Sequence, residues 1–381
     1  MQLFYVRPKL HLFDTFKKFI DAFELRKTDL FITETFLYRS FVEPERLPCH
    51  VILKDLYIKG EPTDEAVDQI FTDLQGLDIQ RVIAMGGGSV IDIAKVLMVR
   101  NGCPVRMLLN GQTSISPDRE LIVLPTTCGT GSEVTSGGII TIQASGQKAA
   151  LIDERLTASH AVLIPELIAA LPMRTFMFCS VDALGHSLES HVSATRGNEF
   201  ARAMSSRAIS MILNGYADMI LHGEEFRTNL LENFIIASCM GGMSVNNSGA
   251  GPVHALAYPL GEKYKMSHGE SIYQFLTVVF GMYRSRIFSP CLDELTMLLS
   301  PPLQRAGFFT SEKNIYVDLH KMLNAVYPLP PLSACGMTVE DIPVFADSIL
   351  KNKQRLLSTS PILLTRDDII ELYSKRFAGE I

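Results

Sequence analysis

RVIAMGGGSVIDIAK, residues 81–95, is the stretch that decides the fold of the first half of the chain. A short apolar run reads as a buried strand, a triple glycine follows it, and an amphipathic run beginning at Ser89 reads as a helix. A strand that passes through glycines into a helix is how a βαβ unit opens, and such units build parallel sheets. We therefore expect an α/β fold around this segment.

The same alternation extends on both sides of the segment, up to about residue 165. Apolar, β-rich runs predict strands at DLFITE (29–34), HVILKDLY (50–57), RVIAMGG (81–87) and ELIVLPTT (120–127). Amphipathic runs predict helices at DEAVDQIFTDLQGL (64–77) and SVIDIAKVLMV (89–99). Together these elements predict a Rossmann-like domain with a parallel sheet.

The second half of the chain has a different periodicity. From about Pro172 onward the strand signal ends, and helical patterns follow one another at residues 210–220, 229–240, 315–327, 341–352 and 366–377. We therefore predict an α/β domain over residues 1–172 and an all-α domain over residues 173–381.

Composition excludes several classes of partner. The chain has 381 residues, a formal net charge of −6 and no block of like charge. It therefore lacks the basic stripe that binding to a phosphate backbone requires, and we expect no nucleic-acid partner. Its seven cysteines are odd in number and scattered, which is typical of reduced thiols in the cytoplasm. The N-terminus lacks the features of a signal peptide.

One segment resembles a membrane span by composition alone. Residues 233–261 contain no Asp, Glu, Lys or Arg and are long enough to cross a bilayer. Asn246, Asn247 and His254 interrupt its apolar character, and unpaired polar groups are costly in lipid. We expect buried protein interior around a site, no membrane association and a cytoplasmic location.

Two glycine-rich loops indicate a phosphate site in the first half. Gly86, Gly87, Gly88 and Ser89 would let the backbone approach an anion at a helix N-terminus, although the motif is not GxGxxG and a tight turn explains it equally well. LPTTCGTGSEVTSGG (124–138) ends another strand with small hydroxyl side chains, at Thr126, Thr127, Thr130 and Thr135. Two such loops at the carboxyl ends of strands form a plausible pyrophosphate cradle.

A second constellation carries metal chemistry. Asp182 and His186, in VDALGHSLES, stand four residues apart and would project from one face of a helix. His254 and His268 would have to join them through tertiary folding, because spacing alone does not show convergence. One carboxylate and three imidazoles form a nitrogen and oxygen ligand set that suits Fe(II) and tolerates Zn(II). The alternative is that Asp182 and His186 lie on a solvent-exposed helix face and that His254 and His268 are packing residues.

These motifs, in this order, resemble the iron-containing, metal-dependent alcohol dehydrogenases. The resemblance rests on GGGSVIDIAK (86–95), PTTCGTGSEVT (125–135), the Asp182 and His186 pair, and HALAYPLG (254–261) followed by HG. Within the family, FYVRPKLHLFDTF (4–16), FITETFLY (31–38) and residues 254–270 look most like 4-hydroxybutyrate dehydrogenases. The resemblance implies the two-domain architecture shared with dehydroquinate synthases, NAD as cofactor and a divalent metal.

Site residues follow from the resemblance by position. It implies a loop over the cofactor pyrophosphate at Gly86, Gly87, Gly88 and Ser89, and a second loop toward the phosphate and nicotinamide ribose at Thr126, Thr127 and Thr130, with Thr135 nearby. Lys148 matches a lysine near the ribose. Glu34 matches an acid that binds the adenosine ribose hydroxyls, which favours NAD over NADP. The metal ligands matched are Asp182, His186, His254 and His268.

One position departs from the family pattern. Many members have a second histidine four residues after the ligand equivalent to His254, and here that residue is Tyr258. Tyrosine can relay a proton, but its reference pKa of about 10 makes it a weaker base at neutral pH. Tyr258 is therefore a candidate proton relay, with packing as the alternative. Lys263, Lys265 and Arg355 are candidates for binding a substrate carboxylate.

The expected reaction is metal-dependent hydride transfer between NAD(H) and a short-chain alcohol or aldehyde, with 4-hydroxybutyrate and succinic semialdehyde as the favoured pair. Alternatives are another small alcohol of the 1,3-propanediol, lactaldehyde or butanol type, a lyase like dehydroquinate synthase, and a non-catalytic nucleotide-binding protein. The expected partners are a small-molecule substrate and further copies of the chain, in a dimer or larger homo-oligomer.

Overall fold

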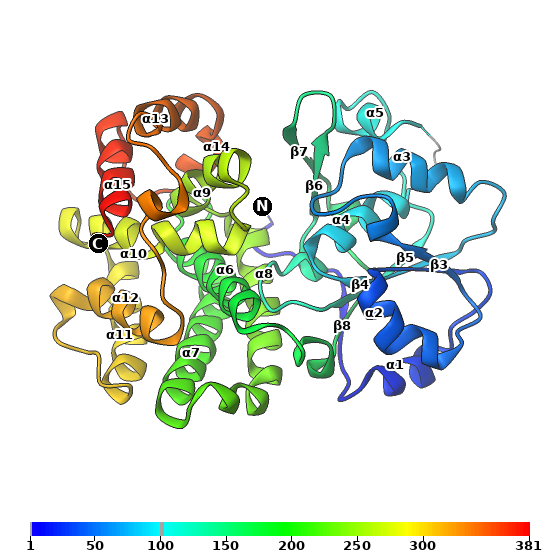
Figure 1. Ribbon diagram of the computed structural model, residues 1–381, viewed down its shortest axis with the longest axis horizontal. Helices are drawn as coiled ribbons and strands as arrows, with labels where there is room; N and C mark the ends of the chain where they lie inside the picture. The colour runs from blue at the N-terminus through cyan, green and yellow to red at the C-terminus, as the bar shows by residue number, and fades with distance from the viewer. Residues whose placement is uncertain (1, 100–102) are drawn as a thin grey trace. The chain divides into compact units, whose positions relative to one another are not determined.

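The computed structural model describes residues 2–99 and 103–381, which form two compact units (Figure 1). The first unit is Val6–Ala170, and the second is Leu171–Ile381 together with residues 2–5. These first residues join the second unit through contacts such as the hydrogen bond from the Tyr5 amide to Asn247 Oδ1, at 2.6 Å. The expected order, an α/β part followed by a helical part, is confirmed.

The first unit contains a parallel sheet of six strands. In spatial order they are β1 (Lys9–Leu12), β8 (His160–Leu163), β5 (Glu120–Pro125), β4 (Arg81–Gly86), β2 (Asp29–Thr33) and β3 (His50–Leu53). A separate antiparallel hairpin consists of β6 (Gly137–Ile142) and β7 (Gln147–Ile152). The sequence did not predict β1 and β8.

Helices and short helical turns connect the strands. The α-helices are α1 (Phe16–Phe23), α2 (Thr35–Leu37), α3 (Asp64–Asp73), α4 (Gly88–Leu97) and α5 (Val105–Leu109). The shorter turns are η1 (Tyr38–Val42), η2 (Glu43–Glu45), η3 (Lys54–Leu56), η4 (Ser132–Val134), η5 (Glu154–Leu156) and η6 (Pro165–Ile168).

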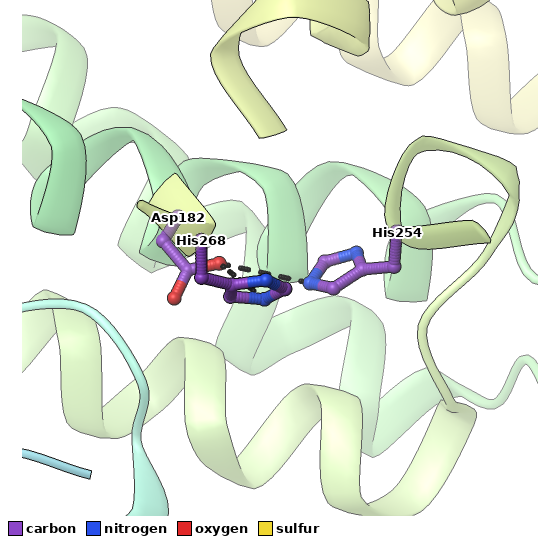
Figure 2. Close-up of side chains that lie close together, drawn as sticks. All are labelled: Asp182, His254 and His268. Atoms are coloured by element: carbon purple, nitrogen blue, oxygen red, sulfur yellow. Dashed lines mark ion pairs between the residues drawn. The ribbon is translucent and has the colours of Figure 1, made fainter. Parts of the chain in front are cut away.

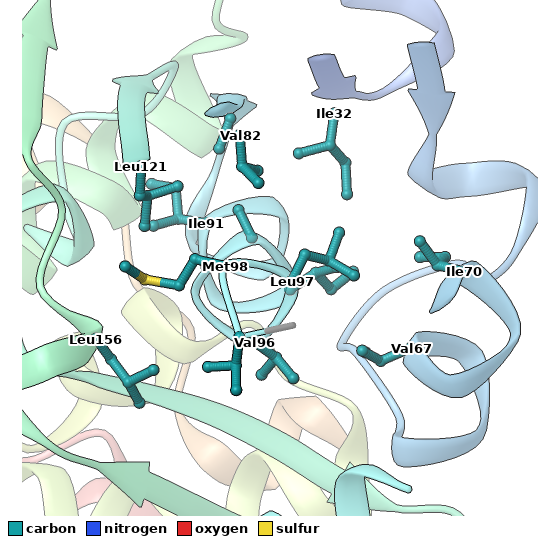
Figure 3. Close-up of a cluster of buried hydrophobic side chains, with 14 of the residues drawn as sticks. Ile32, Val67, Ile70, Val82, Ile91, Val96, Leu97, Met98, Leu121 and Leu156 are labelled. Atoms are coloured by element: carbon teal, nitrogen blue, oxygen red, sulfur yellow. The ribbon is translucent and has the colours of Figure 1, made fainter. Parts of the chain in front are cut away.

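Hydrophobic cores cover both faces of the sheet, as a parallel sheet requires. Successive side chains of a strand point to opposite faces. In β4, Val82 packs in the core that contains α3 and α4 (Figure 3), whereas the next residue, Ile83, packs with Phe16 and Phe19 of α1. Every residue of β4 is buried, which explains why its sequence reads as one apolar run and not as an alternating one.

The second unit contains helices and, among its described residues, no strand. The α-helices are α6 (Met173–His191), α7 (Glu199–His222), α8 (Leu231–Ser248), α9 (Pro252–Tyr264), α10 (His268–Arg286), α11 (Pro290–Arg305), α12 (Ile315–Val326), α13 (Asp341–Asn352), α14 (Gln354–Leu357) and α15 (Arg366–Ala378). The 3-10 turns are η7 (Glu224–Asn229), η8 (Glu312–Asn314) and η9 (Leu332–Cys335). The predicted helical segments coincide with parts of α7, α8, α12, α13 and α15.

The charge-free segment at residues 233–261 forms most of α8 and α9. Gly249 separates the two helices at a φ of 81°, a left-handed backbone conformation that favours glycine. Most of the apolar side chains of the segment are buried. Within the described part of the chain, no helix combines the length and the apolar character that crossing a bilayer needs.

Candidate active site

Three helices of the second unit bring a carboxylate and two imidazoles together (Figure 2). Asp182 lies in the middle of α6, His254 in the first turn of α9, and His268 at the start of α10. Asp182 Oδ1 is 3.7 Å from His254 Nε2 and 3.6 Å from His268 Nε2. One ligand atom from each residue lies within 4.8 Å of the other two. The convergence that sequence spacing alone could not show is therefore confirmed for these three side chains.

His186 lies beside this cluster, one turn after Asp182. Its Nε2 is 3.9 Å from Asp182 Oδ1, and its ring stacks on the His254 ring with centroids 4.6 Å apart. It is not part of the group whose ligand atoms converge within 4.8 Å. Its role as a fourth ligand stays a prediction.

The cluster has the properties of a cation site. Asp182 Oδ1 and His254 Nε2 are buried and have no hydrogen-bond partner, although buried polar atoms are nearly always paired. Metal–ligand bonds of about 2.1 Å in a tetrahedral site would place ligand atoms roughly 3.4 Å apart. The separations of 3.6 and 3.7 Å are close to this value. The residues therefore fit a divalent transition metal.

Glu189, one turn after His186 on α6, holds His254 in place. Its buried carboxylate accepts hydrogen bonds from the amides of Gly251 (2.8 Å) and Val253 (2.6 Å) and from Nδ1 of His254. Because Nδ1 is engaged in this way, Nε2 of the same ring faces Asp182. A carboxylate behind a histidine ligand commonly sets the orientation and tautomer of the ring. Glu189 was not predicted from the sequence, although its position one helical turn beyond His186 was a usable signal.

The electrostatics of the cluster favour positive charge. Burial alone would lower the pKa of His254, but Glu189 and Asp182 raise it to about 9. Burial would raise the pKa of Asp182, whereas the neighbouring His186, His268 and His254 hold it well below its usual range. Burial lowers the pKa of His186 to about 4. The two buried carboxylates, Glu189 and Asp182, thus stabilise positive charge at His254, where a cation would bind.

Two glycines allow α6 and α10 to approach closely at the site. A Cβ atom on Gly269 would lie 2.0 Å from the carbonyl oxygen of Phe178, and one on Gly185 would lie 2.8 Å from Ile272 Cγ2. Gly269 directly follows His268. The position of this ligand relative to Asp182 therefore depends on a helix contact that only glycine permits.

Tyr258 lies one turn after His254 on α9, half-buried beside His268. The two rings meet edge to face, with centroids 6.4 Å apart.

Two of the candidates for binding a substrate carboxylate, Lys263 and Lys265, already have partners within the protein. Lys263 Nζ forms an ion pair with Asp341, and Lys265 Nζ donates to the Glu262 carbonyl at 3.0 Å.

The two glycine-rich loops lie side by side in the first unit. Gly86, at the end of β4, pairs with Pro125 at the end of β5, and the Thr126 amide donates to the Gly86 carbonyl at 3.1 Å. A Cβ atom on Gly88 would lie 3.2 Å from Thr130 Cγ2. Gly87 is the N-cap of α4 and supplies no side-chain acceptor, while the Val90 amide donates to the Gly87 carbonyl at 3.0 Å. Binding of an anion by the amides of Gly88 and Ser89 stays a prediction.

A buried lysine fixes the second loop onto α4. Lys95 Nζ donates to Ser132 Oγ at 3.0 Å, to Thr135 Oγ1 at 3.1 Å and to the Gly137 carbonyl at 2.6 Å. Asp92 accepts from Ser132 Oγ at 3.0 Å, and burial lowers the pKa of Lys95 to about 8. Thr135, predicted near the cofactor, thus has a structural partner. Lys95 and Asp92 were not predicted from the sequence as site residues.

The remaining predicted cofactor residues lie on the same unit. Glu34 is the N-cap residue of α2, directly after β2, and its carboxylate is 3.5 Å from Lys54 Nζ. Lys148 lies on β7 and donates to Glu61 Oε1 at 2.6 Å. These contacts give both side chains protein partners, and their roles toward a cofactor stay predictions.

Comparison with known proteins identifies the family. The model for the C-terminal part of the Fe-containing alcohol dehydrogenase family matches residues 176–377, and the model for iron-containing alcohol dehydrogenase matches residues 24–165. The chain is 36% identical to a 4-hydroxybutyrate dehydrogenase of Clostridium kluyveri over 377 residues, which cover 99% of this chain and 100% of the relative.

Solved structures share the fold. A sulfoacetaldehyde reductase from Bifidobacterium kashiwanohense, solved in complex with NAD+, superimposes with a TM-score of 0.84 at 18% identity, covering 99% of each chain. An alcohol dehydrogenase from Oenococcus oeni gives a TM-score of 0.82 at 19% identity, covering 98% of this chain and 99% of that one. With the family models matching both halves of the sequence, this chain belongs to the iron-containing alcohol dehydrogenase family.

Proposed function

We propose that the protein is an NAD-dependent dehydrogenase that interconverts 4-hydroxybutyrate and succinic semialdehyde. The observation that carries the chemistry is the buried Asp182, His254 and His268 cluster with its unpaired ligand atoms. Support for the substrate comes from the full-length identity of 36% to a 4-hydroxybutyrate dehydrogenase. The reaction balances as 4-hydroxybutyrate and NAD+ giving succinic semialdehyde, NADH and a proton.

Fe(II) or Zn(II), held by Asp182, His254 and His268 with His186 beside them, would supply Lewis-acid catalysis at the alcohol or carbonyl oxygen. NAD(H) would exchange the hydride. Glu189 keeps His254 Nε2 facing the cluster, and the first-turn amides of α4 would bind the cofactor pyrophosphate. Tyr258, whose ring lies beside that of His268, would move the proton of the substrate hydroxyl during oxidation.

Glu34 supports NAD over NADP. Its carboxylate stands at the carboxyl end of β2, next to β4 and its glycine loop in the sheet. An acid there can accept hydrogen bonds from ribose hydroxyls and repels a 2′-phosphate. Glu34→Gln should therefore narrow the preference for NADH over NADPH, measured as the ratio of the two kcat/KM values.

The direct test is reduction of succinic semialdehyde by NADH, followed by NADH absorbance after loading the protein with Fe(II) or Zn(II). We expect turnover that depends on added metal, and none in an Asp182→Asn variant. Absence of NADH consumption with succinic semialdehyde and with simple aldehydes would rule out the dehydrogenase. If uncharged aldehydes are turned over as fast as succinic semialdehyde, the proposed dehydrogenase activity stands and the proposed substrate is wrong.

We also propose a homo-oligomer, a dimer or larger. The support is the exposed edge strand β1, where the apolar side chains of Leu10 and Leu12 are 48% and 46% exposed. An edge strand of this kind offers unpaired backbone groups to a second chain. Sedimentation of a monomer at micromolar concentration would contradict the proposal.

A further inference from the structure

A lysine at the end of β3 contacts the side chain of Glu34, the candidate ribose-binding residue at the end of β2. The two strands are parallel neighbours, and their register pairs Thr33 with Leu53. The next residue of the chain is Glu34 after β2 and Lys54 after β3. Lys54 Nζ lies 3.5 Å from Glu34 Oε1, so the two side chains form an ion pair at the carboxyl edge of the sheet.

The two partners of this ion pair differ in exposure. The side chain of Lys54 is 3% exposed, whereas that of Glu34 is 28% exposed. A lysine is almost never fully buried unless its ammonium group is paired. The Lys54 ammonium group also donates to the Gly60 carbonyl at 2.6 Å, which holds it in place. The ion pair therefore joins a fixed cation to a carboxylate that still reaches solvent.

The backbone around Glu34 is held as well. The Glu34 carbonyl accepts from the Tyr38 amide at 2.9 Å, and the Thr35 amide donates to Asp55 Oδ1 at 2.7 Å. Glu34 is the N-cap of α2 but makes no side-chain capping hydrogen bond. Its carboxylate is thus not engaged by its own helix, and Lys54 orients it.

We propose that Lys54 is a positioning residue that holds the Glu34 carboxylate ready for the adenosine ribose of NAD. This inference rests on the proposed function and deepens its cofactor site. In the sheet, β2 lies next to β4 and its glycine loop, and an acid at the end of β2 accepts hydrogen bonds from ribose hydroxyls. A carboxylate has about four acceptor positions, so Glu34 can pair with Lys54 and bind a ribose at the same time. A side chain that is already ordered loses less entropy on binding, which raises the affinity.

The test is calorimetric titration of the metal-loaded, full-length protein with NAD+. Lys54→Met removes the ammonium group and keeps an unbranched apolar side chain. It should weaken NAD+ binding by about 2- to 10-fold, the effect of leaving one side chain to be ordered on binding. Lys59→Met removes an exposed lysine close by in the sequence and is the matched control.

A double-mutant cycle distinguishes positioning from general structural support. If Lys54 acts through Glu34, Lys54→Met should have no further effect on NAD+ binding in a Glu34→Ala background. In the kinetics, Lys54→Met should raise KM for NADH and leave KM for succinic semialdehyde unchanged. Unchanged NAD+ affinity in Lys54→Met would overturn the proposal, as would an equal loss in the Glu34→Ala background, which indicates a structural role.

Failure of the proposed function gives a different result. Wild-type protein that binds NAD+ without reducing succinic semialdehyde would reject the proposed function, and the titrations still decide the role of Lys54. Wild-type protein that does not bind NAD+ would overturn both proposals.

Discussion

At the scale of single residues, the two ring nitrogens of His254 face different groups. Nδ1 bonds to Glu189, and Nε2 faces Asp182 at 3.7 Å. Glu189 also accepts hydrogen bonds from the amides of Gly251 and Val253, so one carboxylate orients the His254 ring and anchors the start of α9. Removing its charge should therefore act on the metal site without removing any ligand.

We predict that Glu189→Gln lowers metal affinity by about 10- to 100-fold, the usual effect of losing a partner behind a ligand. An amide oxygen can replace only part of the acceptor capacity of a carboxylate, and its NH2 group cannot accept. Competition with a chelating dye measures the affinity. Glu294→Gln is the matched control, because Glu294 contacts His191, outside the cluster. Equal affinities in the two variants would contradict the role of Glu189.

Tyr258 makes a separate prediction about the proton. If its hydroxyl relays the substrate proton, Tyr258→Phe should lower kcat at least about tenfold while metal content stays unchanged. The ring remains in this variant. Tyr316→Phe removes a buried hydroxyl that has no hydrogen-bond partner, and it should leave kcat unchanged. Unaltered turnover in Tyr258→Phe would assign the residue to packing.

Some residues of the site could be predicted from the sequence and others could not, for physical reasons. Asp182 and His186 were visible as a pair because helical spacing is a local property. The convergence of His254 and His268 on Asp182 depends on tertiary packing, and motif order suggested it only through the family resemblance. Lys54 had no local signal at all, because it meets Glu34 only through the pairing of β2 with β3.

At the scale of elements, length and periodicity decided what could be predicted. Central strands such as β4 and β5 carry long apolar runs and were predicted, whereas β1 and β8 were not. In the second unit, α12, α13 and α15 were predicted close to their observed ends, whereas only parts of α7 and α8 were predicted. The close contact between α6 and α10 was not, because it depends on the space left at single glycines.

That contact yields a prediction for Gly269→Ala. The new Cβ would meet the backbone oxygen of Phe178 at 2.0 Å, so α10 must shift relative to α6 and carry His268 with it. We expect a stability loss of about 1–3 kcal/mol, typical of overpacking, and weaker metal binding. Gly281→Ala, in the same helix, is the control, because a Cβ atom on Gly281 would meet no neighbouring atom within 4 Å. For this variant we expect the free energy of unfolding, measured by chemical denaturation, to rise by about 0.4–1 kcal/mol.

At the scale of the whole molecule, the candidate metal site and the candidate cofactor site lie on different units. The candidate metal ligands all belong to the unit formed mainly by Leu171–Ile381, whereas the glycine-rich loops belong to Val6–Ala170. A ligand that binds only the folded state stabilises the structure that holds it. Metal and cofactor should therefore protect different parts of the chain.

Metal binding should raise the unfolding free energy of the helical unit by about 2.7 kcal/mol when free metal is 100-fold above its Kd. Hydrogen exchange should localise this effect to α6, α9 and α10, because local opening of these helices separates the ligands. NAD alone should instead protect the β4–α4 junction and the loop after β5. Asp182→Asn should abolish the metal response and leave the NAD response intact. Metal-dependent protection confined to the sheet unit, or retained in Asp182→Asn, would show that the cluster is not the metal site.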